Sequence, residues 1–138
     1  MVEAVVVDTM IASAWLGVRQ SERQSRWAAV LEPARWVLPF AVVAEMRFGA
    51  EVAGWGARRR GVLERLIARS GVVPPLAPVI DSYVDLRVRC SQTGHGLAAK
   101  NHEADRWVAA VAVAAGLPLA TEDSIFENVD GLELVQAG

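Results

Sequence analysis

The chain has 138 residues and a mass of 14.9 kDa, and 53% of its residues are hydrophobic and 22% charged, which predicts one globular domain over residues 1–138. Its 14 Lys and Arg residues against 16 Asp and Glu residues give a net charge near −2. This balance excludes a strongly basic nucleic-acid-binding surface but allows a local basic patch. The single cysteine, Cys90, excludes an intrachain disulfide and favours a reducing compartment.

The sequence predicts a cytoplasmic protein with no membrane contact. The apolar run near the N-terminus has no basic residues before it and ends at Asp8, unlike a targeting segment. The longest uncharged stretch, residues 107–121, is shorter than the roughly 20 residues of a membrane span and contains Pro118.

Five short apolar runs predict strands, at residues 4–7, 36–38, 72–73, 119–121 and 132–135. The first reads Ala-Val-Val-Val without polar alternation, which is typical of a strand buried on both faces. Helical patterns lie between them, at residues 11–16, 21–31, 41–53, 58–69, 79–91 and 103–115, with a short turn at 124–127. We expect Asn101 to cap the last long helix and Gly116 to end it. Alternating strands and helices predict an α/β fold with a parallel sheet covered on both faces.

Two acids follow predicted strands. Asp8 comes directly after the first strand, and Asp123 lies two residues past the fourth. Functional sites of open parallel sheets form outside the carboxyl ends of the strands, so both acids are at positions suited to chemistry. Each could instead cap the short helix that follows it.

Two further acids, Glu45 and Asp105, fall within apolar stripes of predicted helices. The apolar neighbours of Glu45 at helical spacing are Val42, Phe48 and Val52. Those of Asp105 are Val108, Ala109 and Ala112. An ionised carboxylate that faces a core is costly unless it is paired or binds a metal, although Glu45 could also pair with a buried arginine.

Four converging carboxylates would repel one another, by about 4 kcal/mol for charges about 4 Å apart at an effective dielectric near 20. A hard divalent cation relieves this repulsion, and ligands that are all oxygens select Mg²⁺ or Mn²⁺. His95 and His102 have no thiol partner at zinc-site spacing, so we interpret them as loop and helix-start residues.

Four segments occur in an order that is similar to one known family. They read V-V-V-D-T-M-I at 5–11, A-V-V-A-E-M-R-F-G-A at 41–50, A-D-R-W-V-A-A-V-A at 104–112 and T-E-D-S-I-F-E-N-V-D-G-L-E-L-V at 121–135. In these segments the chain resembles PIN-domain nucleases, specifically the VapC-type toxins of bacterial toxin–antitoxin pairs.

The resemblance implies a three-layer α/β/α fold with a five-stranded parallel sheet. It implies an Mg²⁺- or Mn²⁺-dependent endoribonuclease that cleaves structured RNA, either tRNA or rRNA. The acidic quartet of the family falls on Asp8, Glu45, Asp105 and Asp123; Asp8, Asp105 and Asp123 would be the metal ligands, and Glu45 would bind through water or act as a general base. Thr9 and Thr121 match hydroxyl positions that help to hold the site. A cognate antitoxin and a homodimer are also implied.

Two positions depart from the family pattern. Met10 occupies a position where many relatives have Asn or Ser. The last segment is one residue shorter than the common form, so Glu122 is the alternative to Asp123 as the fourth acid.

An acidic site also needs cations to position RNA phosphates. Arg47 and the run Arg58, Arg59 and Arg60 are our candidates for RNA contact, although a solvated helix face explains the run equally well. We expect the antitoxin to occupy a groove between residues 41–53 and 58–69. Its apolar contacts would be Phe48, Val52, Val62 and Leu66.

Two other functions remain open. A phosphate-accepting α/β signalling domain also has an Asp at a strand end, but it needs paired acids after the first strand and a late Lys, and this chain has neither. A catalytically silent PIN-like binding module is the second alternative.

Overall fold

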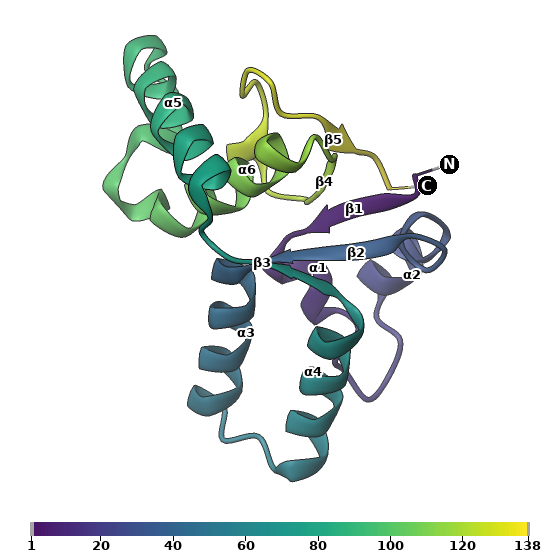
Figure 1. Cartoon of the computed structure of the whole chain (residues 1–138). Helices are drawn as coiled ribbons and strands as arrows, with labels where there is room; N and C mark the ends of the chain where they lie inside the picture. The colour runs from purple at the N-terminus through teal and green to yellow at the C-terminus, as the bar shows by residue number, and fades with distance from the viewer. Residues whose placement is uncertain (1, 138) are drawn as a thin grey trace.

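The computed structural model describes residues 2–137 and contains one five-stranded sheet with the order β3-β2-β1-β4-β5 (Figure 1). The strands are β1 (Ala4–Val7), β2 (Arg35–Pro39), β3 (Gly71–Val73), β4 (Leu119–Ala120) and β5 (Leu134–Val135). Every neighbouring pair is parallel, as the sequence predicts. The carboxyl ends of all five strands therefore meet at one edge of the sheet.

Helices cover the sheet on both faces. They are α1 (Thr9–Ser13), α2 (Glu22–Leu31), α3 (Phe40–Val52), α4 (Ala57–Arg69), α5 (Ala77–Thr93) and α6 (Glu103–Ala115), with 3₁₀ turns η1 (Gly96–Ala98), η2 (Lys100–His102) and η3 (Ser124–Phe126). In Figure 1, α1, α3 and α4 lie below the strands, and α5 and α6 lie above them. This arrangement confirms the predicted α/β/α architecture. Among residues 2–137, no helix is long and apolar enough to cross a membrane.

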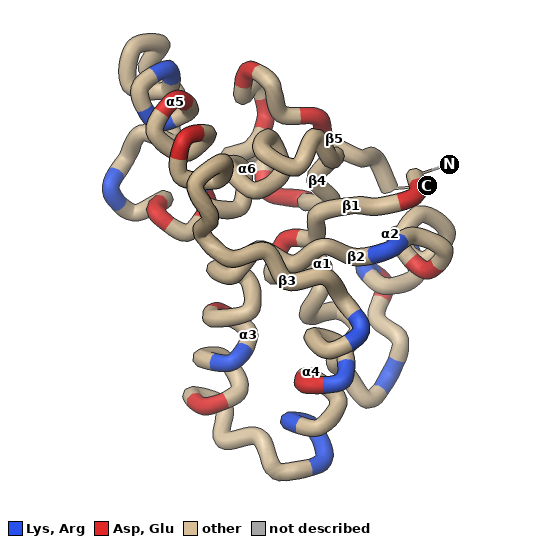
Figure 2. The backbone as a smooth tube through the Cα atoms, in the orientation of Figure 1, with Lys and Arg blue, Asp and Glu red and all other residues tan. Residues whose placement is uncertain are grey.

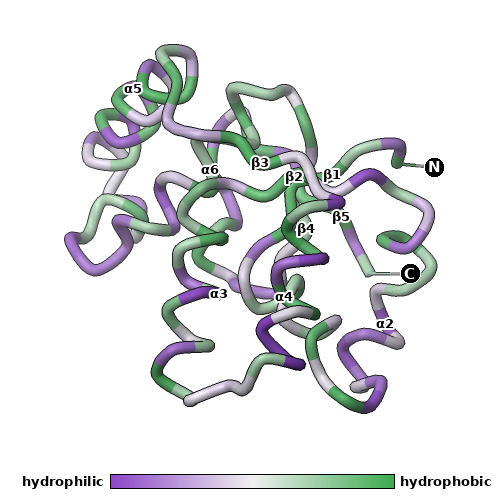
Figure 3. The backbone as a smooth tube through the Cα atoms, turned by 60° about the horizontal axis from the view of Figure 1, so that its bottom comes forward, coloured by the Kyte–Doolittle hydropathy of each residue, from purple (hydrophilic) through white to green (hydrophobic). Residues whose placement is uncertain are grey.

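The central strand β1 explains why its sequence lacks polar alternation. Val6 pairs with Val37 of β2 on one side and with Leu119 of β4 on the other, so β1 has no free edge. Val5, Val6 and Val7 are fully buried between the two helical layers. Figure 3 shows the hydrophobic strands in the middle of the molecule and mixed colours on the surrounding helices. Asp8 follows the last of these buried valines and lies at the carboxyl end of β1.

Helix α6 begins at Glu103, as predicted, but its cap differs from the prediction. The residue before its first turn is His102 rather than Asn101, and no side chain caps the helix there. The reason is that residues 100–102 form the 3₁₀ turn η2, so Asn101 lies inside this turn instead of at the cap of the helix. The predicted end is confirmed: Gly116 adopts a left-handed conformation with φ 65°, which closes the helix.

The two helices α3 and α4 form a hairpin that extends beyond the sheet (Figure 1). The prediction that the apolar stripe around Glu45 faces the core is therefore correct only near the sheet. Val42 is fully buried, but Phe48 and Val52 are 70% and 71% exposed. The distal half of α3 has no sheet to cover, so its inward face is a narrower strip that ends at Met46 and Ala50.

Candidate active site

Four carboxylates from four elements line one cleft at the carboxyl edge of the sheet. Asp8 follows β1, Glu45 lies in α3, Asp105 lies in α6 and Asp123 follows β4. The cleft has a volume of about 540 Å³. The structure thus brings together all four acids that the sequence singled out, although 115 positions separate the first from the last.

Asp8 is the most enclosed of the four, with 9% of its surface exposed. Its Oδ1 accepts a hydrogen bond from the Thr9 amide at 2.7 Å, and its Oδ2 accepts one from the Thr121 hydroxyl at 2.8 Å. Burial raises the pKa of the Asp8 carboxyl despite these two hydrogen bonds, and the negative charges of Asp105 and Asp123 raise it further. Thr121 also accepts from the Asp123 amide at 3.0 Å, so one hydroxyl connects two of the acids.

Glu45 faces the same cleft from α3, and its side chain is more open to solvent than that of Asp8. Partial burial raises the pKa of its carboxyl, and the neighbouring negative charges of Asp8 and Asp105 add to the rise. The Thr9 hydroxyl is near enough to Glu45 to counter part of this rise in pKa. The hydroxyl is buried and forms no hydrogen bond of normal length within residues 2–137. It is therefore a donor without a protein acceptor beside the carboxylates.

Asp105 lies half-buried in the first turn of α6, and its apolar neighbours are buried as the sequence predicts. His102 contacts it: Nδ1 lies 2.7 Å from Asp105 Oδ2. The sequence pattern predicts for His102 only a position at the helix start. The spacing of three residues was the available signal, because side chains three apart are neighbours on a helix.

The two consecutive acids after β4 point to different partners. Glu122 binds Arg23 at 2.8 Å, Arg26 at 2.7 Å and the Trp27 indole N–H at 3.0 Å, all on α2. These hydrogen bonds, first those from Arg23 and Arg26, lower the pKa of Glu122 to about 2. Asp123 lines the cleft, and its Oδ1 accepts from the Ile125 amide at 3.0 Å.

The donor chemistry of the cleft fits a hard divalent cation, since every candidate ligand is a carboxylate oxygen. Burial first, and then the neighbouring negative charges, raise the pKa values of Asp8 and Glu45, and a bound cation would favour the ionised form of both groups. Within residues 2–137, no three acidic, His or Cys side chains close around a single point as they stand. Glu45 and Asp123 are the two of the four acids that are exposed to solvent.

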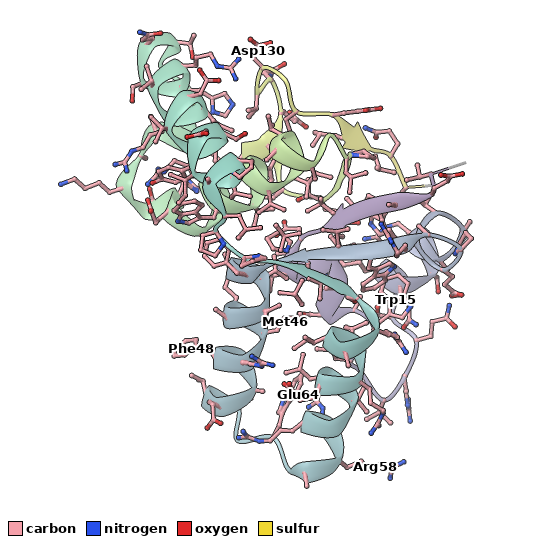
Figure 4. All side chains as sticks on the ribbon, in the orientation of Figure 1. Trp15, Met46, Phe48, Arg58, Glu64 and Asp130 are labelled. Atoms are coloured by element: carbon pink, nitrogen blue, oxygen red, sulfur yellow. The ribbon has the colours of Figure 1, made fainter. Side chains whose placement is uncertain are left out.

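The arginines predicted to contact RNA lie outside this cleft, on the α3–α4 hairpin. Arg47 forms an ion pair with Glu64 of α4 at 2.7 Å, with both side chains exposed. Arg58 lies at the far tip of the hairpin (Figure 4). Arg59 stacks on the Trp55 ring at 3.9 Å, and Arg60 binds Glu51 and the Trp55 carbonyl. Figure 2 shows this basic run at the bottom of the molecule, away from the sheet edge.

Two arginines that the sequence analysis did not select line the cleft instead. Arg19 lies in the segment between α1 and α2, and Arg23 lies in the first turn of α2. A signal for them exists in the sequence. Both follow the first predicted strand, and the segments that follow parallel strands start at the carboxyl edge of the sheet.

Residues 5–132 match the family model described as PIN domain. The chain belongs to the PIN domain family. The fold and the four motifs agree with this assignment, and the family resemblance inferred from the sequence is confirmed. A comparison with curated proteins finds no match.

Solved structures with the same fold cover almost the whole chain. VapBC2 from Rickettsia felis, bound to a DNA fragment from its promoter, has a TM-score of 0.79 and 17% identity, covering 98% of this chain and 99% of that chain. FitAcB from Neisseria gonorrhoeae has a TM-score of 0.73 and 26% identity, covering 95% and 96%. VapBC-5 from Mycobacterium tuberculosis, a member of the VapBC family of toxin-antitoxin systems, has a TM-score of 0.68 and 22% identity, covering 97% and 98%.

The strand order also separates this PIN domain from the signalling alternative. Phosphate-accepting domains of the flavodoxin-like type have the order 2-1-3-4-5, with their site at the switch point between the first and third strands. Here β1 has β2 and β4 as its neighbours, so the site lies between the ends of β1 and β4. The α/β signalling domain is therefore not supported.

Proposed function

We propose that this chain is a metal-dependent endoribonuclease and the toxin of a toxin–antitoxin pair. The observation that carries the proposal is the meeting of Asp8, Glu45, Asp105 and Asp123 in one cleft at the carboxyl edge of a PIN-domain sheet. A binding module has no need for four carboxylates in one cleft, two of which have pKa values raised by burial and by the neighbouring negative charges. The proposed substrate is structured RNA, either tRNA or rRNA.

Asp8, Asp105 and Asp123 are the proposed ligands of Mg²⁺ or Mn²⁺. A bound divalent cation supplies a water of lowered pKa and offsets charge on the scissile phosphate. Thr9 and Thr121 fix the Asp8 carboxylate through the 2.7 and 2.8 Å hydrogen bonds, and His102 orients Asp105. Glu45 is the proposed general base, because its raised pKa makes it a better proton acceptor than an ordinary carboxylate.

The proposed protein partner is a cognate antitoxin. Several proteins with this fold were solved as VapBC toxin–antitoxin complexes, which supports a partner of the same kind here. A groove of about 320 Å³ runs between α3 and α4, bordered by Phe48 and Leu63 and by charged side chains. Of the other predicted contacts, Val62 is half-buried, Val52 is largely exposed and Leu66 belongs to the core. An antitoxin segment with an aromatic anchor and an arginine fits this groove and the acidic cleft.

A homodimer is also proposed, and α5 is the surface that supports it. Its outer face carries an apolar row at four-residue spacing, which comprises Leu76 just before the helix and Ile80, Val84 and Val88 within it, all exposed. A continuous apolar row on a helix is uncommon on a monomer surface.

Cleavage of RNA by the purified protein tests the catalytic proposal. We expect cleavage of total RNA with Mg²⁺ or Mn²⁺ and none in EDTA, and we expect Asp105→Asn to be inactive with metal present. Equal cleavage in EDTA would exclude the metal mechanism. A folded wild-type protein that cleaves no RNA with either metal would favour the silent binding module.

The toxin role needs a separate experiment in cells. We expect induction of the wild-type chain to arrest growth, and co-expression of the neighbouring small open reading frame to restore growth and yield a co-purifying complex. Unimpaired growth together with the absence of a small partner would exclude the toxin role even if nuclease activity were observed.

A further inference from the structure

The acidic cleft presents an electrostatic problem for the proposed substrate. Four carboxylates line it, and an RNA phosphate brings further negative charge to the same place. Protein–nucleic acid contacts to phosphate are made mainly by Arg and Lys, so cationic side chains are needed close to the carboxylates. Among residues 2–137, the cationic side chains that line the cleft are those of Arg19 and Arg23.

Arg23 is held in place but keeps donors to spare. Its Nε donates to Glu122 Oε1 at 2.8 Å, and its side chain is 36% exposed. A guanidinium has five N–H donors, and within residues 2–137 this is the one that Arg23 uses. Because Arg26 and Trp27 bind the other Glu122 oxygen, α2 stays attached to the β4 edge whatever Arg23 binds. The Arg23 guanidinium is thus held by Glu122 and keeps N–H donors available beside the cleft.

Arg19 is exposed and forms no ion pair with a carboxylate of residues 2–137. It lies two residues before Ser21, which caps α2 and lines the cleft as well. The first turn of α2 therefore adds the positive end of a helix dipole to the same wall. Arg19, Ser21 and Arg23 thus line the same cleft as the four acids, which follow β1 and β4 or lie in α3 and α6.

We infer that Arg19 and Arg23 bind the phosphodiester backbone of the RNA substrate and hold it across the acidic cleft. The inference rests on the proposed function. It assigns the phosphate contacts nearest the scissile bond to the start of α2 rather than to Arg47 and Arg58–Arg60, which lie on the α3–α4 hairpin outside the cleft. Glu122 is then a positioning residue, because it fixes the direction of Arg23.

The test compares Arg19→Ala and Arg23→Ala with two matched controls. Arg26→Ala removes an ion pair of 2.7 Å to the same carboxylate from the same helix, but Arg26 does not line the cleft. Arg58→Ala removes a charge at the hairpin tip. Binding of a labelled tRNA fraction is measured by fluorescence anisotropy with Mg²⁺ over a series of salt concentrations, with all variants in an Asp105→Asn background so that RNA stays intact. Cleavage rates are measured with Asp105 present.

We expect Arg19→Ala and Arg23→Ala each to weaken RNA binding about tenfold and to reduce the slope of log affinity against log salt by about 1. The controls should change affinity less than about threefold. A loss in Arg26→Ala equal to that in Arg23→Ala would show a merely structural effect and overturn the inference, as would a larger loss in Arg58→Ala. RNA binding that depends on the two arginines, without any cleavage, would uphold the inference and reject the nuclease function. Cleavage that is independent of both arginines would uphold the nuclease function and reject the inference.

Discussion

Asp8 is a carboxylate in an environment that disfavours its ionised form. It leaves a strand of fully buried valines, and burial together with two neighbouring acids raises its pKa. Hydrogen bonds from Thr9 and Thr121 compensate in part. Such a residue is expected to cost stability and to be retained for function.

We predict that Asp8→Asn abolishes RNA cleavage while the metal-free protein melts at the same temperature as the wild type or higher. The amide retains both hydrogen bonds, because its oxygen accepts from the Thr9 amide and its NH₂ donates to the Thr121 hydroxyl, while one repelling charge disappears. Calorimetry in EDTA measures the melting temperature. Asp81→Asn on α5, outside the cleft, is the control and should leave both properties unchanged. An Asp8→Asn protein that melts well below the wild type would make Asp8 chiefly structural.

At the scale of elements, Arg106 is the residue that joins α6 to the turns before it. It is 1% exposed, and its guanidinium donates to the Leu97 and Ala99 carbonyls at 2.6 Å each and to Glu103. These contacts fix η1 and η2, the turns that lead to His102 and Asp105.

We predict that Arg106→Met lowers the free energy of unfolding by about 2–4 kcal/mol, because the buried Leu97 carbonyl and the part-buried Ala99 carbonyl lose their donor. Urea denaturation measures this change. Arg87→Met on the exposed side of the same Tyr83–Glu103 cluster is the control, with an expected loss under about 1 kcal/mol. Equal stabilities for the two variants would contradict the role assigned to Arg106.

The α3–α4 hairpin gives a prediction about pH. Arg47 lowers the pKa of Glu64 through a hydrogen bond and its charge, so this acid stabilises the fold when ionised. The contribution is present above the ordinary pKa of 4.5 and is lost as the pH falls through the lower folded value. We predict that Glu64→Gln lowers the free energy of unfolding at pH 7 by about 0.2–1 kcal/mol, the usual range for an exposed ion pair. The difference from the wild type should vanish at low pH.

Glu32→Gln is the control for the pH series, since Glu32 is exposed and has no ion pair among residues 2–137. It should match the wild type throughout. A difference for Glu64→Gln that grows as the pH falls would have the wrong sign and would reject this account of the hairpin.

At the scale of the whole molecule, the exposed apolar row of α5 is the feature that a single copy leaves unexplained. We predict that the wild type is a dimer in analytical ultracentrifugation and that Val84→Asp is a folded monomer, because an acid placed in the middle of the row would be buried without a partner. Phe48→Asp alters a similarly exposed apolar residue on α3 and should leave the dimer intact. A monomeric wild type, or dissociation by Phe48→Asp alone, would contradict the assignment of the interface to α5.

The sequence by itself determined the features that depend on local pattern. Buried strands appear as short valine-rich runs, and α6 ends at Gly116 because glycine readily adopts the positive φ required there. The positions of Asp8 and Asp123 after strands, and the apolar neighbours of Glu45 and Asp105, selected all four acids of the cleft. Each of these signals lies within about seven residues of the side chain concerned.

Only the tertiary structure decided which charged groups meet. Arg23 and Glu122 are 99 residues apart in sequence, and their contact directs Glu122 to α2 while Asp123 lines the cleft. The exposure of Phe48 was equally hidden, because a helical stripe predicts a buried face but not where the sheet beneath it ends. The physical reason is the same in both cases: local periodicity orients a side chain relative to its own element, whereas the packing of distant elements decides what that side chain touches.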